Sequence, residues 1–302
     1  MGFDCVGIGC SALDHLGIVS RWPEVDEKIP INHLTIQGGG LVATALVAMA
    51  RLGARVALLG KQGDDPFGQE ILRLLDADGV DHSRVVIEPH ARSHFAFCVV
   101  DEQTGKRTIF HARGTESAFR AHELDRDVIQ SARCLLIDAH YPEASEAAAR
   151  WAREAGVPVV IDAEKPLEPE RTEVLQHCDH IVPSRAFAQA FAGVCDFEEA
   201  ARRIFEAFRP TAVAITLGED GCIGYDGAEV IRQPVFPVDV VDTTGAGDVF
   251  HGAYAFGLLR GWPLREMLRF ASAVAALKCR KLGGRAGIPT LAQTQAFLEK
   301  SG

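Results

Sequence analysis

Short apolar runs alternate with longer amphipathic stretches along most of the chain. The runs typical of strands are 3–9, 55–60, 134–138, 158–162, 180–182 and 212–217, and the helical stretches are 42–51, 66–78 and 144–155, with further helices near Thr172 and up to Arg209. Strands that alternate with helices of 10–15 residues predict β-α-β units and a mostly parallel sheet covered on both faces. The pattern therefore predicts an α/β fold.

One region departs from this alternation. Two strand patterns, 94–101 and 107–111, flank the turn-prone segment 102–106, which predicts a hairpin. Short strand patterns also occur at 16–19 and 33–37. We expect segments within about 12–37 and 92–113 to build a small antiparallel sheet, which stands as a lid over the C-terminal edge of the main sheet. Residues 1–302 otherwise form one α/β domain.

Composition excludes several classes of protein. Hydrophobic residues make up 47% of the 302 residues, which is enough for a large core, and the formal net charge is −10 without any basic block. This charge argues against nucleic-acid binding. The eight cysteines form no CxxC pair and predict small buried hydrophobes in a reducing cytoplasm. The chain shows no signal peptide pattern and no apolar run of about 18 residues, so we expect a cytoplasmic protein without a membrane span.

The run Asp242-Thr243-Thr244-Gly245-Ala246-Gly247-Asp248 carries the strongest chemical signal. Strand-like residues 238–241 precede it and a helical stretch, 249–259, follows it. Small residues at such a turn let backbone N–H groups converge on an anion. A neighbouring carboxylate, Asp248, can then accept the proton of a hydroxyl that attacks a phosphoryl group. The alternative is an ordinary helix start capped by Thr243 or Thr244, but the two flanking aspartates favour the anion site.

The run Gly7-Ile8-Gly9-Cys10-Ser11-Ala12 matches a dinucleotide-binding pattern only weakly. Gly17, two β-branched residues and Pro23 follow it, so no helix is expected there to receive a pyrophosphate. An NAD-dependent oxidoreductase is therefore disfavoured.

The Asp242–Asp248 run resembles the C-terminal signature of the PfkB (ribokinase-like) carbohydrate kinases. Segments 38–53, 216–221 and 282–289 resemble the other motifs of that family, in the expected order. The resemblance implies a three-layer α/β/α fold with a β lid, and a cytoplasmic kinase that uses ATP and Mg²⁺ to phosphorylate a sugar. It further implies that Asp248 is the general base and that Gly245, Ala246 and Gly247 form the anion hole.

The same resemblance assigns binding roles. It implies sugar contacts by Asp14, Gly39, Gly40 and Thr44, and nucleotide contacts by Thr216, Gly218, Gly221, Gly283 and Gly284. In several members the first aspartate of the signature helps to bind a monovalent cation such as K⁺, and the candidates here are Asp242 and Thr244, with helix capping as the alternative for Asp242. The Asn-x-x-Glu motif of many members is replaced by Pro183-Ser184-Arg185-Ala186-Phe187. Mg²⁺ would then be held mainly by ATP phosphates, water and other carboxylates.

A closer resemblance, strongest after residue 235, is to the ketose-kinase branch that contains sulfofructose kinase. Lys28 stands where that branch contacts the anionic end of its sugar, whereas His111 and His140 replace an Asn and an Arg. Loss of an arginine removes a bidentate anion clamp. A neutral ketose or another acidic sugar therefore stays open, as do ribose, ketogluconate, fructose phosphate and nucleosides. His111 and His140 can also be plain lid-strand and strand-end residues.

Two further expectations follow from the family resemblance. The lid sheet often joins two subunits in this family, which implies a homodimer through the lid. The alternative function is a catalytically silent protein that binds a sugar or nucleoside, although the intact Asp248 argues against it.

Overall fold

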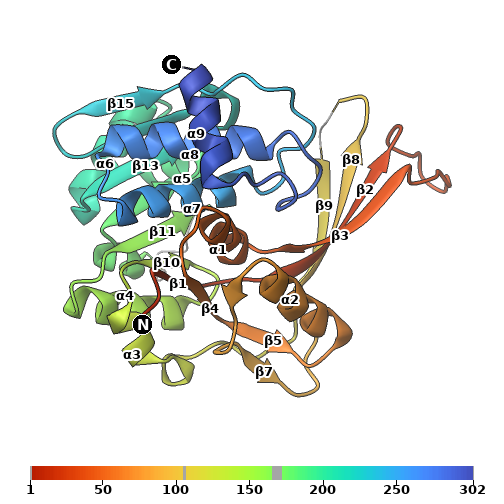
Figure 1. Cartoon of the computed structure of the whole chain (residues 1–302), viewed down its shortest axis with the longest axis horizontal. Helices are drawn as coiled ribbons and strands as arrows, with labels where there is room; N and C mark the ends of the chain where they lie inside the picture. The colour runs from red at the N-terminus through yellow and green to blue at the C-terminus, as the bar shows by residue number, and fades with distance from the viewer. Residues whose placement is uncertain (1, 105–106, 165–171, 302) are drawn as a thin grey trace.

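The computed structural model describes residues 2–104, 107–164 and 172–301 (Figure 1). Its main element is a nine-stranded sheet. All neighbouring strands in it are parallel except the pairs β13–β14 and β14–β15, which are antiparallel. In spatial order the strands are β15 (Val230–Gln233), β14 (Cys222–Tyr225), β13 (Ala212–Thr216), β12 (His180–Pro183), β11 (Val159–Ala163), β10 (Leu135–Asp138), β1 (Cys5–Ile8), β4 (Val56–Leu59) and β6 (Val80–Asp81). The predicted mostly parallel sheet is confirmed.

Helices cover both faces of this sheet, because successive strand residues point to opposite sides. Leu136 of β10 packs into one core, whereas Leu135 and Ile137 pack into the other. The first core is closed by α1 (Leu41–Arg51), α2 (Pro66–Ala77), α7 (Ala246–Leu259), α8 (Leu264–Lys278) and α9 (Leu291–Lys300). The second is closed by α3 (Arg126–Ser131), α4 (Pro142–Glu154), α5 (Arg185–Ala192) and α6 (Phe197–Phe208). The fold is the expected three-layer α/β/α arrangement.

A four-stranded sheet, which we call the lid sheet, projects to the side of the main body (Figure 1). Its order is β3 (His33–Gly39), β2 (Ala12–Val19), β8 (Phe95–Asp101) and β9 (Arg107–Ala112). The expected purely antiparallel pairing is wrong in one place, because β2 and β8 are parallel. The chain passes through α1, β4 and α2 before it returns as β8, so the turn geometry of a hairpin does not constrain this pair. Part of the predicted 102–106 turn, residues 105–106, lies outside the described residues.

The strand expected at 238–241 is also wrong. No strand forms over these residues, and Val240 and Val241 are exposed. The N–H groups of Val241 and Asp242 both donate to the carbonyl of Cys279, at 2.9 and 3.1 Å. The segment is thus held by the end of α8 and not by a sheet. The short elements not foreseen include β5 (Lys61–Gly63), β7 (Val86–Glu88) and the 3₁₀ turns η1 (Ala121–Glu123) and η4 (Gly218–Asp220), whereas η3 (Glu173–His177) is the helix expected near Thr172.

All eight cysteines are free, and all but Cys10 and Cys195 are buried, as expected of small core residues. Among the described helices, none combines the length and the apolar character that crossing a bilayer requires.

Candidate active site

Helix α7 begins with an uncapped turn at the signature. Its N-cap is Gly245, in a left-handed conformation with φ 73°, and no side chain caps the helix. A Cβ atom at Gly245 would lie 2.8 Å from Cα of Gly284, so only glycine fits this close approach. A Cβ at Gly247 would meet nothing within 4 Å, so the first turn is open in front. This start therefore offers N–H groups and the positive end of the helix dipole to an anion.

Asp248 lies in the first turn of α7 and is half-buried. Burial raises its pKa well above the ordinary range, and the negative charge of Asp162 raises it further, while the nearby His251 acts in the opposite direction. Asp162 is the penultimate residue of β11, at the carboxyl edge of the main sheet, and is itself buried. A carboxylate with a raised pKa beside an anion site is suited to take a proton near neutral pH.

The predicted cation residues form a compact buried turn. The Oδ1 atom of Asp242 accepts the N–H of Thr244 at 2.8 Å and its hydroxyl at 2.7 Å. Its Oδ2 atom accepts the N–H of Gly283 at 2.7 Å. The structure therefore brings Asp242, Thr244, Gly283 and Gly284 together against the start of α7.

The lid side contributes Asp14 and the glycine run. Burial raises the pKa of Asp14 to about 6, and the positive charge of Arg285 opposes that shift. A Cβ at Gly39 would lie 2.2 Å from Oδ2 of Asp14, and one at Gly40 (φ 90°) would lie 2.4 Å from the carbonyl of Cys10. Gly39 thus permits β3 to pack directly on the Asp14 carboxylate, and Gly40 permits the start of α1 to approach the backbone of Cys10. Thr44 is buried on α1, where Nε of Arg285 donates to its hydroxyl at 3.4 Å.

The two other predicted lid residues differ in position. His111 pairs with Ala96 of β8, which pairs with Asp14 of β2, so His111 and Asp14 share one face of the lid sheet. Lys28 is exposed on the loop between β2 and β3 and makes no hydrogen bond or ion pair with a described residue. The structure therefore supports a site role for His111 more than for Lys28.

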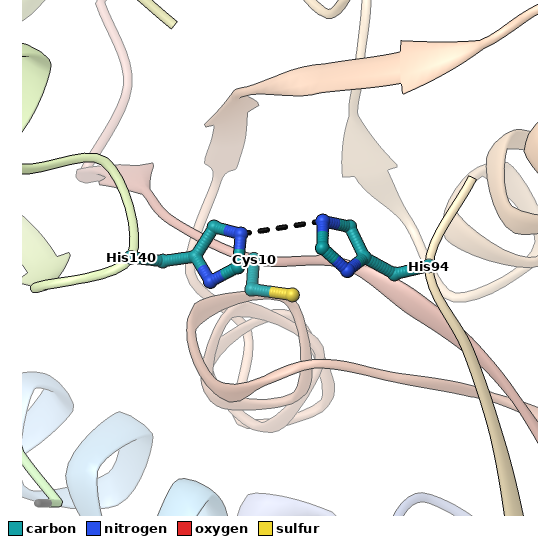
Figure 2. Close-up of side chains that lie close together, drawn as sticks. All are labelled: Cys10, His94 and His140. Atoms are coloured by element: carbon teal, nitrogen blue, oxygen red, sulfur yellow. Dashed lines mark hydrogen bonds between the residues drawn. The ribbon is translucent and has the colours of Figure 1, made fainter. Parts of the chain in front are cut away.

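His140 lies just beyond β10 in a small polar cluster (Figure 2). The donor atoms of Cys10, His94 and His140 lie within 4.8 Å of one another, a spacing that a metal ion could bridge. However, Nδ1 of His94 accepts the N–H of Gly114 at 3.2 Å, so the neutral ring carries its proton on Nε2. That Nε2 lies 3.2 Å from Nε2 of His140, which can accept the proton. The two rings are thus satisfied as a hydrogen-bonded pair without a metal.

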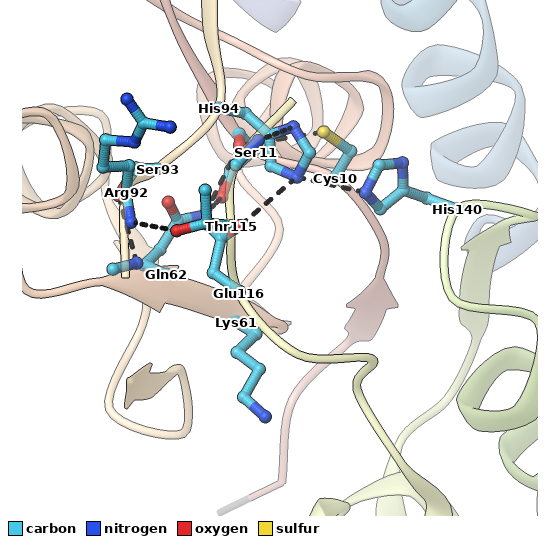
Figure 3. Close-up of polar contacts among 12 residues, drawn as sticks. Cys10, Ser11, Lys61, Gln62, Arg92, Ser93, His94, Thr115, Glu116 and His140 are labelled. Atoms are coloured by element: carbon cyan, nitrogen blue, oxygen red, sulfur yellow. Dashed lines mark hydrogen bonds and ion pairs between the residues drawn. The ribbon is translucent and has the colours of Figure 1, made fainter. Parts of the chain in front are cut away.

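This pair is fixed by its surroundings. The Asp138 carboxylate accepts the N–H groups of Cys10 and His140, at 3.0 and 2.8 Å, which pins both backbones to the end of β10. Burial lowers the pKa of His94 to about 4, so its ring stays neutral. Figure 3 shows Glu116 approaching the same nitrogen of His94, with Oε2 3.8 Å from Nε2. These contacts therefore hold the His140 ring in one orientation.

The predicted nucleotide turn follows β13. Gly218 and Gly221 have φ values of 64° and 85°, which glycine adopts without strain, and they close the η4 turn. The hydroxyl of Thr216 donates to the carbonyl of Pro183 at 3.4 Å. This turn lies at the same carboxyl edge of the parallel strands as Asp162, where open α/β sheets bind ligands.

A cleft of about 750 Å³ is lined by His94, Arg113, His140, Asp162 and Glu164, among others. It thus joins the histidine pair to the carboxylates near Asp248. A second hollow of about 740 Å³, lined by Cys195, Leu217 and Arg232 among others, contains none of the predicted site residues. We therefore place the chemistry at the first cleft.

Sequence reasoning missed His94, His251, Lys278 and Arg285. A signal existed for two of them. His251 follows Asp248 by three residues on one helix, and Lys278 ends an apolar helical stretch where a lysine is unusual. Arg285 lies within the motif-like segment 282–289, but nothing there points to its contacts with the lid side, and nothing in the sequence around His94 distinguishes it.

Comparison with known proteins agrees with this geometry. The family model described as "pfkB family carbohydrate kinase" matches residues 4–291. The ribokinase of Bacillus subtilis is 30% identical over 299 residues, covering 97% of this chain and 98% of its own. A candidate ribokinase from Agrobacterium tumefaciens has a TM-score of 0.93 at 30% identity, covering 100% and 99% of the two chains. An Arabidopsis thaliana ribokinase complexed with ribose and ATP has a TM-score of 0.84 at 25% identity, covering 99% of each.

These relatives bear on the closer resemblance as well. They are ribokinases or a candidate ribokinase, so they support the family and not the predicted sulfofructose kinase branch.

Proposed function

The chain belongs to the pfkB family of carbohydrate kinases, and we propose that it transfers the γ-phosphoryl group of ATP to a primary hydroxyl of a sugar with Asp248 as the general base. One observation carries the assignment of the base. The uncapped, glycine-lined start of α7 and the raised pKa of Asp248 coincide in a single helical turn. An anion site and a proton acceptor are the two parts that phosphoryl transfer to an alcohol requires.

In this mechanism the residues of the chain position and polarise the reactants. Asp248 orients the sugar hydroxyl and takes its proton as the oxygen attacks the γ-phosphorus in line, while the bond from that phosphorus to the bridging oxygen breaks and ADP leaves. The N–H groups of Gly245, Ala246 and Gly247 stabilise the charge that spreads over the phosphoryl oxygens. Closure of the lid sheet excludes water, which would otherwise compete as acceptor.

The residues at the carboxyl edge fit ATP and Mg²⁺. The η4 turn with Thr216, Gly218 and Gly221 lies on the nucleotide side, and Gly283 and Gly284 flank the start of α7. Asp162 and Glu164 line the cleft with carboxylate oxygens, the donor type that Mg²⁺ prefers, and would hold it together with the phosphates. Bound Mg²⁺ supplies charge neutralisation at the transferring phosphates.

We place the sugar between Asp14, Gly39, Gly40 and Thr44 on the lid side and the histidine pair on the other. The arginines that line the cleft, Arg113 and Arg120, suit an anionic sugar, whereas its four carboxyl groups do not; these belong to Glu116, Glu143, Asp162 and Glu164. A ketose or acidic ketose, including a sulfosugar, and ribose both remain candidates. The ribose bound by the Arabidopsis relative favours testing ribose first.

We also infer a cytoplasmic homodimer joined through the lid sheet. In-register residues His15, Ile36, Phe97 and Phe110 share the face opposite to Asp14. On that face Ile36 is 46% and Phe110 is 53% exposed, and Trp22 stacks on Phe110. An exposed aromatic and aliphatic patch of this kind suits association with a second copy.

A coupled assay of ATP turnover tests the proposal. The panel contains ribose, fructose, tagatose, fructose 1- and 6-phosphates, sulfofructose, ketogluconates and nucleosides, each with Mg²⁺. Turnover that depends on one sugar supports the kinase and identifies its substrate. If no sugar increases ATP consumption while sugar or nucleoside binding is detected by calorimetry, the chain is a silent binding protein and the catalytic proposal fails.

A further inference from the structure

Lys278 is a fully buried lysine at the C-terminal end of α8, and its ammonium group lies against the signature turn. Its Nζ atom donates to the backbone carbonyl of Asp242 at 2.9 Å. The exposed fraction of both residues is 0%. Burying an ammonium group costs free energy unless the group is paired. The contact with the Asp242 turn must therefore offset that cost.

The oxygen atoms of Asp242 are already occupied by donors from the chain itself. Oδ1 accepts two hydrogen bonds from Thr244, and Oδ2 accepts the N–H of Gly283 at 2.7 Å. The main-chain carbonyl accepts the Lys278 ammonium. A monovalent cation binds through oxygen lone pairs, and at Asp242 most of these accept N–H and O–H groups, while the Lys278 ammonium on the main-chain carbonyl would repel a second cation. The predicted cation residues therefore do not fit K⁺.

A nearby positive charge nevertheless stabilises this turn, because a buried carboxylate is costly unless it is also paired electrostatically. The Asp242 carboxylate is buried, and it lies in the turn that leads into the anion hole at Gly245. Lys278 supplies that charge from the main body. Arg107 of the lid sheet, which is exposed, donates to the hydroxyl of the adjacent Thr243 at 2.6 Å. Lys278 is thus the buried cation that contacts residues 242–244, and Arg107 contacts the same residues from the solvent side.

We propose that the ammonium group of Lys278 takes the place of a bound monovalent cation, so that the kinase works at full rate without K⁺. Lys278 is then a positioning residue. It holds residues 242–244 against the end of α8 and so keeps the amides of the α7 start aimed at the phosphoryl group. This inference rests on the proposed kinase function, because it concerns the cation requirement of that reaction.

The test compares wild-type protein with Lys278→Met, which keeps the aliphatic stem and removes the charge. Turnover and thermal unfolding are measured with tetramethylammonium as the only monovalent cation, and again with K⁺ or NH₄⁺. We expect wild-type kcat and Tm to be the same in both buffers. The variant should lose about tenfold or more in kcat without K⁺, the scale of a disturbed anion hole, and recover part of it with K⁺ or NH₄⁺. Lys281→Met, an exposed lysine in the same segment, is the matched control and should match wild type.

Two results would overturn the inference: wild-type turnover or Tm that rises with K⁺, or a Lys278→Met protein with wild-type kcat in buffer without K⁺. If the variant does not fold, the K⁺ titration of wild type still decides. If no sugar is phosphorylated, the proposed function fails separately, and the response of wild-type Tm to K⁺ still tests the cation site.

Discussion

His251 lies three residues beyond Asp248 on α7, and its Nε2 atom is 3.4 Å from Oδ1 of Asp162. The same nitrogen is 2.9 Å from the carbonyl of Val182, and Nδ1 is 2.6 Å from the carbonyl of Gly247. Both ring nitrogens thus face carbonyl oxygens, which only accept hydrogen bonds. The His251 ring and the Asp162 carboxyl group therefore lie together beside the proposed base, where Asp162 raises the pKa of Asp248 and His251 lowers it.

Substitution of His251 and substitution of Asp162 should move the pH profile of kcat/KM in opposite directions. Asp248 works as a base only when ionised, so kcat/KM falls as the pH drops through its raised pKa. His251→Gln removes a positive neighbour and should shift this acid limb to higher pH. Asp162→Asn removes a negative neighbour and should shift it to lower pH. Profiles of kcat/KM for the sugar check this, and equal shifts of the same sign would rule the pairing out.

Asp248→Asn should abolish most turnover while it leaves nucleotide binding intact. The amide has nearly the same shape but cannot accept the hydroxyl proton, and loss of a general base costs about 10²–10⁴ in rate. The measurement is kcat together with the Kd of ATP from calorimetry. A variant that retains wild-type kcat would show that another group accepts the proton.

Sugar affinity should weaken as the pH falls through about 6. Burial raises the pKa of Asp14 to about 6, so below that value its carboxylate is protonated and loses acceptor capacity. Above it, the ionised group accepts sugar hydroxyls. Arg285 opposes the shift, so Arg285→Gln should move this transition to higher pH. Titration of the sugar without ATP between pH 5 and 8 measures it, with Asp14→Asn as the variant that should show no such transition.

The α/β alternation could be predicted because strands such as β10 and β12 are buried along their whole length and so appear as short apolar runs. The parallel pairing of β2 with β8 could not, because the partner of a strand is chosen by long-range packing. The segment at 238–241 has strand-forming residues, but its N–H groups bond to Cys279 instead. Tertiary contacts overrode local propensity there.

The site was predictable where chemistry coincides with a local motif. Asp242 to Asp248 form one contiguous turn, so their proximity follows from the sequence. His94 and His140 are far apart in the chain and meet only because the start of β8 lies near the end of β10 at the cleft. Arg285 faces Gly38 and Gly39 across more than 240 positions, at which distance no periodicity operates.

Gly39→Ala should raise the KM of the sugar without changing that of ATP. The new Cβ would lie 2.2 Å from Oδ2 of Asp14, so the carboxylate must move from its position. We expect a rise of about tenfold in KM, which corresponds to about 1.4 kcal/mol. Gly17→Ala, in β2 of the same sheet, is the control because its Cβ would meet only the side chains of Ile31, at 3.2 Å, and Phe97, at 3.7 Å, and no predicted site residue. Equal KM values in both variants would contradict the role of the glycine.

Phe110→Asp should convert the inferred dimer into monomers. Phe110 is 53% exposed on the outer face of the lid sheet, where it stacks on Trp22 at a centroid distance of 6.3 Å. A carboxylate at this position would have to be desolvated inside an apolar interface, which is strongly unfavourable. Sedimentation velocity of the two proteins measures the change, with Phe191→Asp on α5 as a control at an exposed aromatic residue outside the lid sheet. A wild-type monomer, or a Phe110→Asp dimer, would show that this face does not join two subunits.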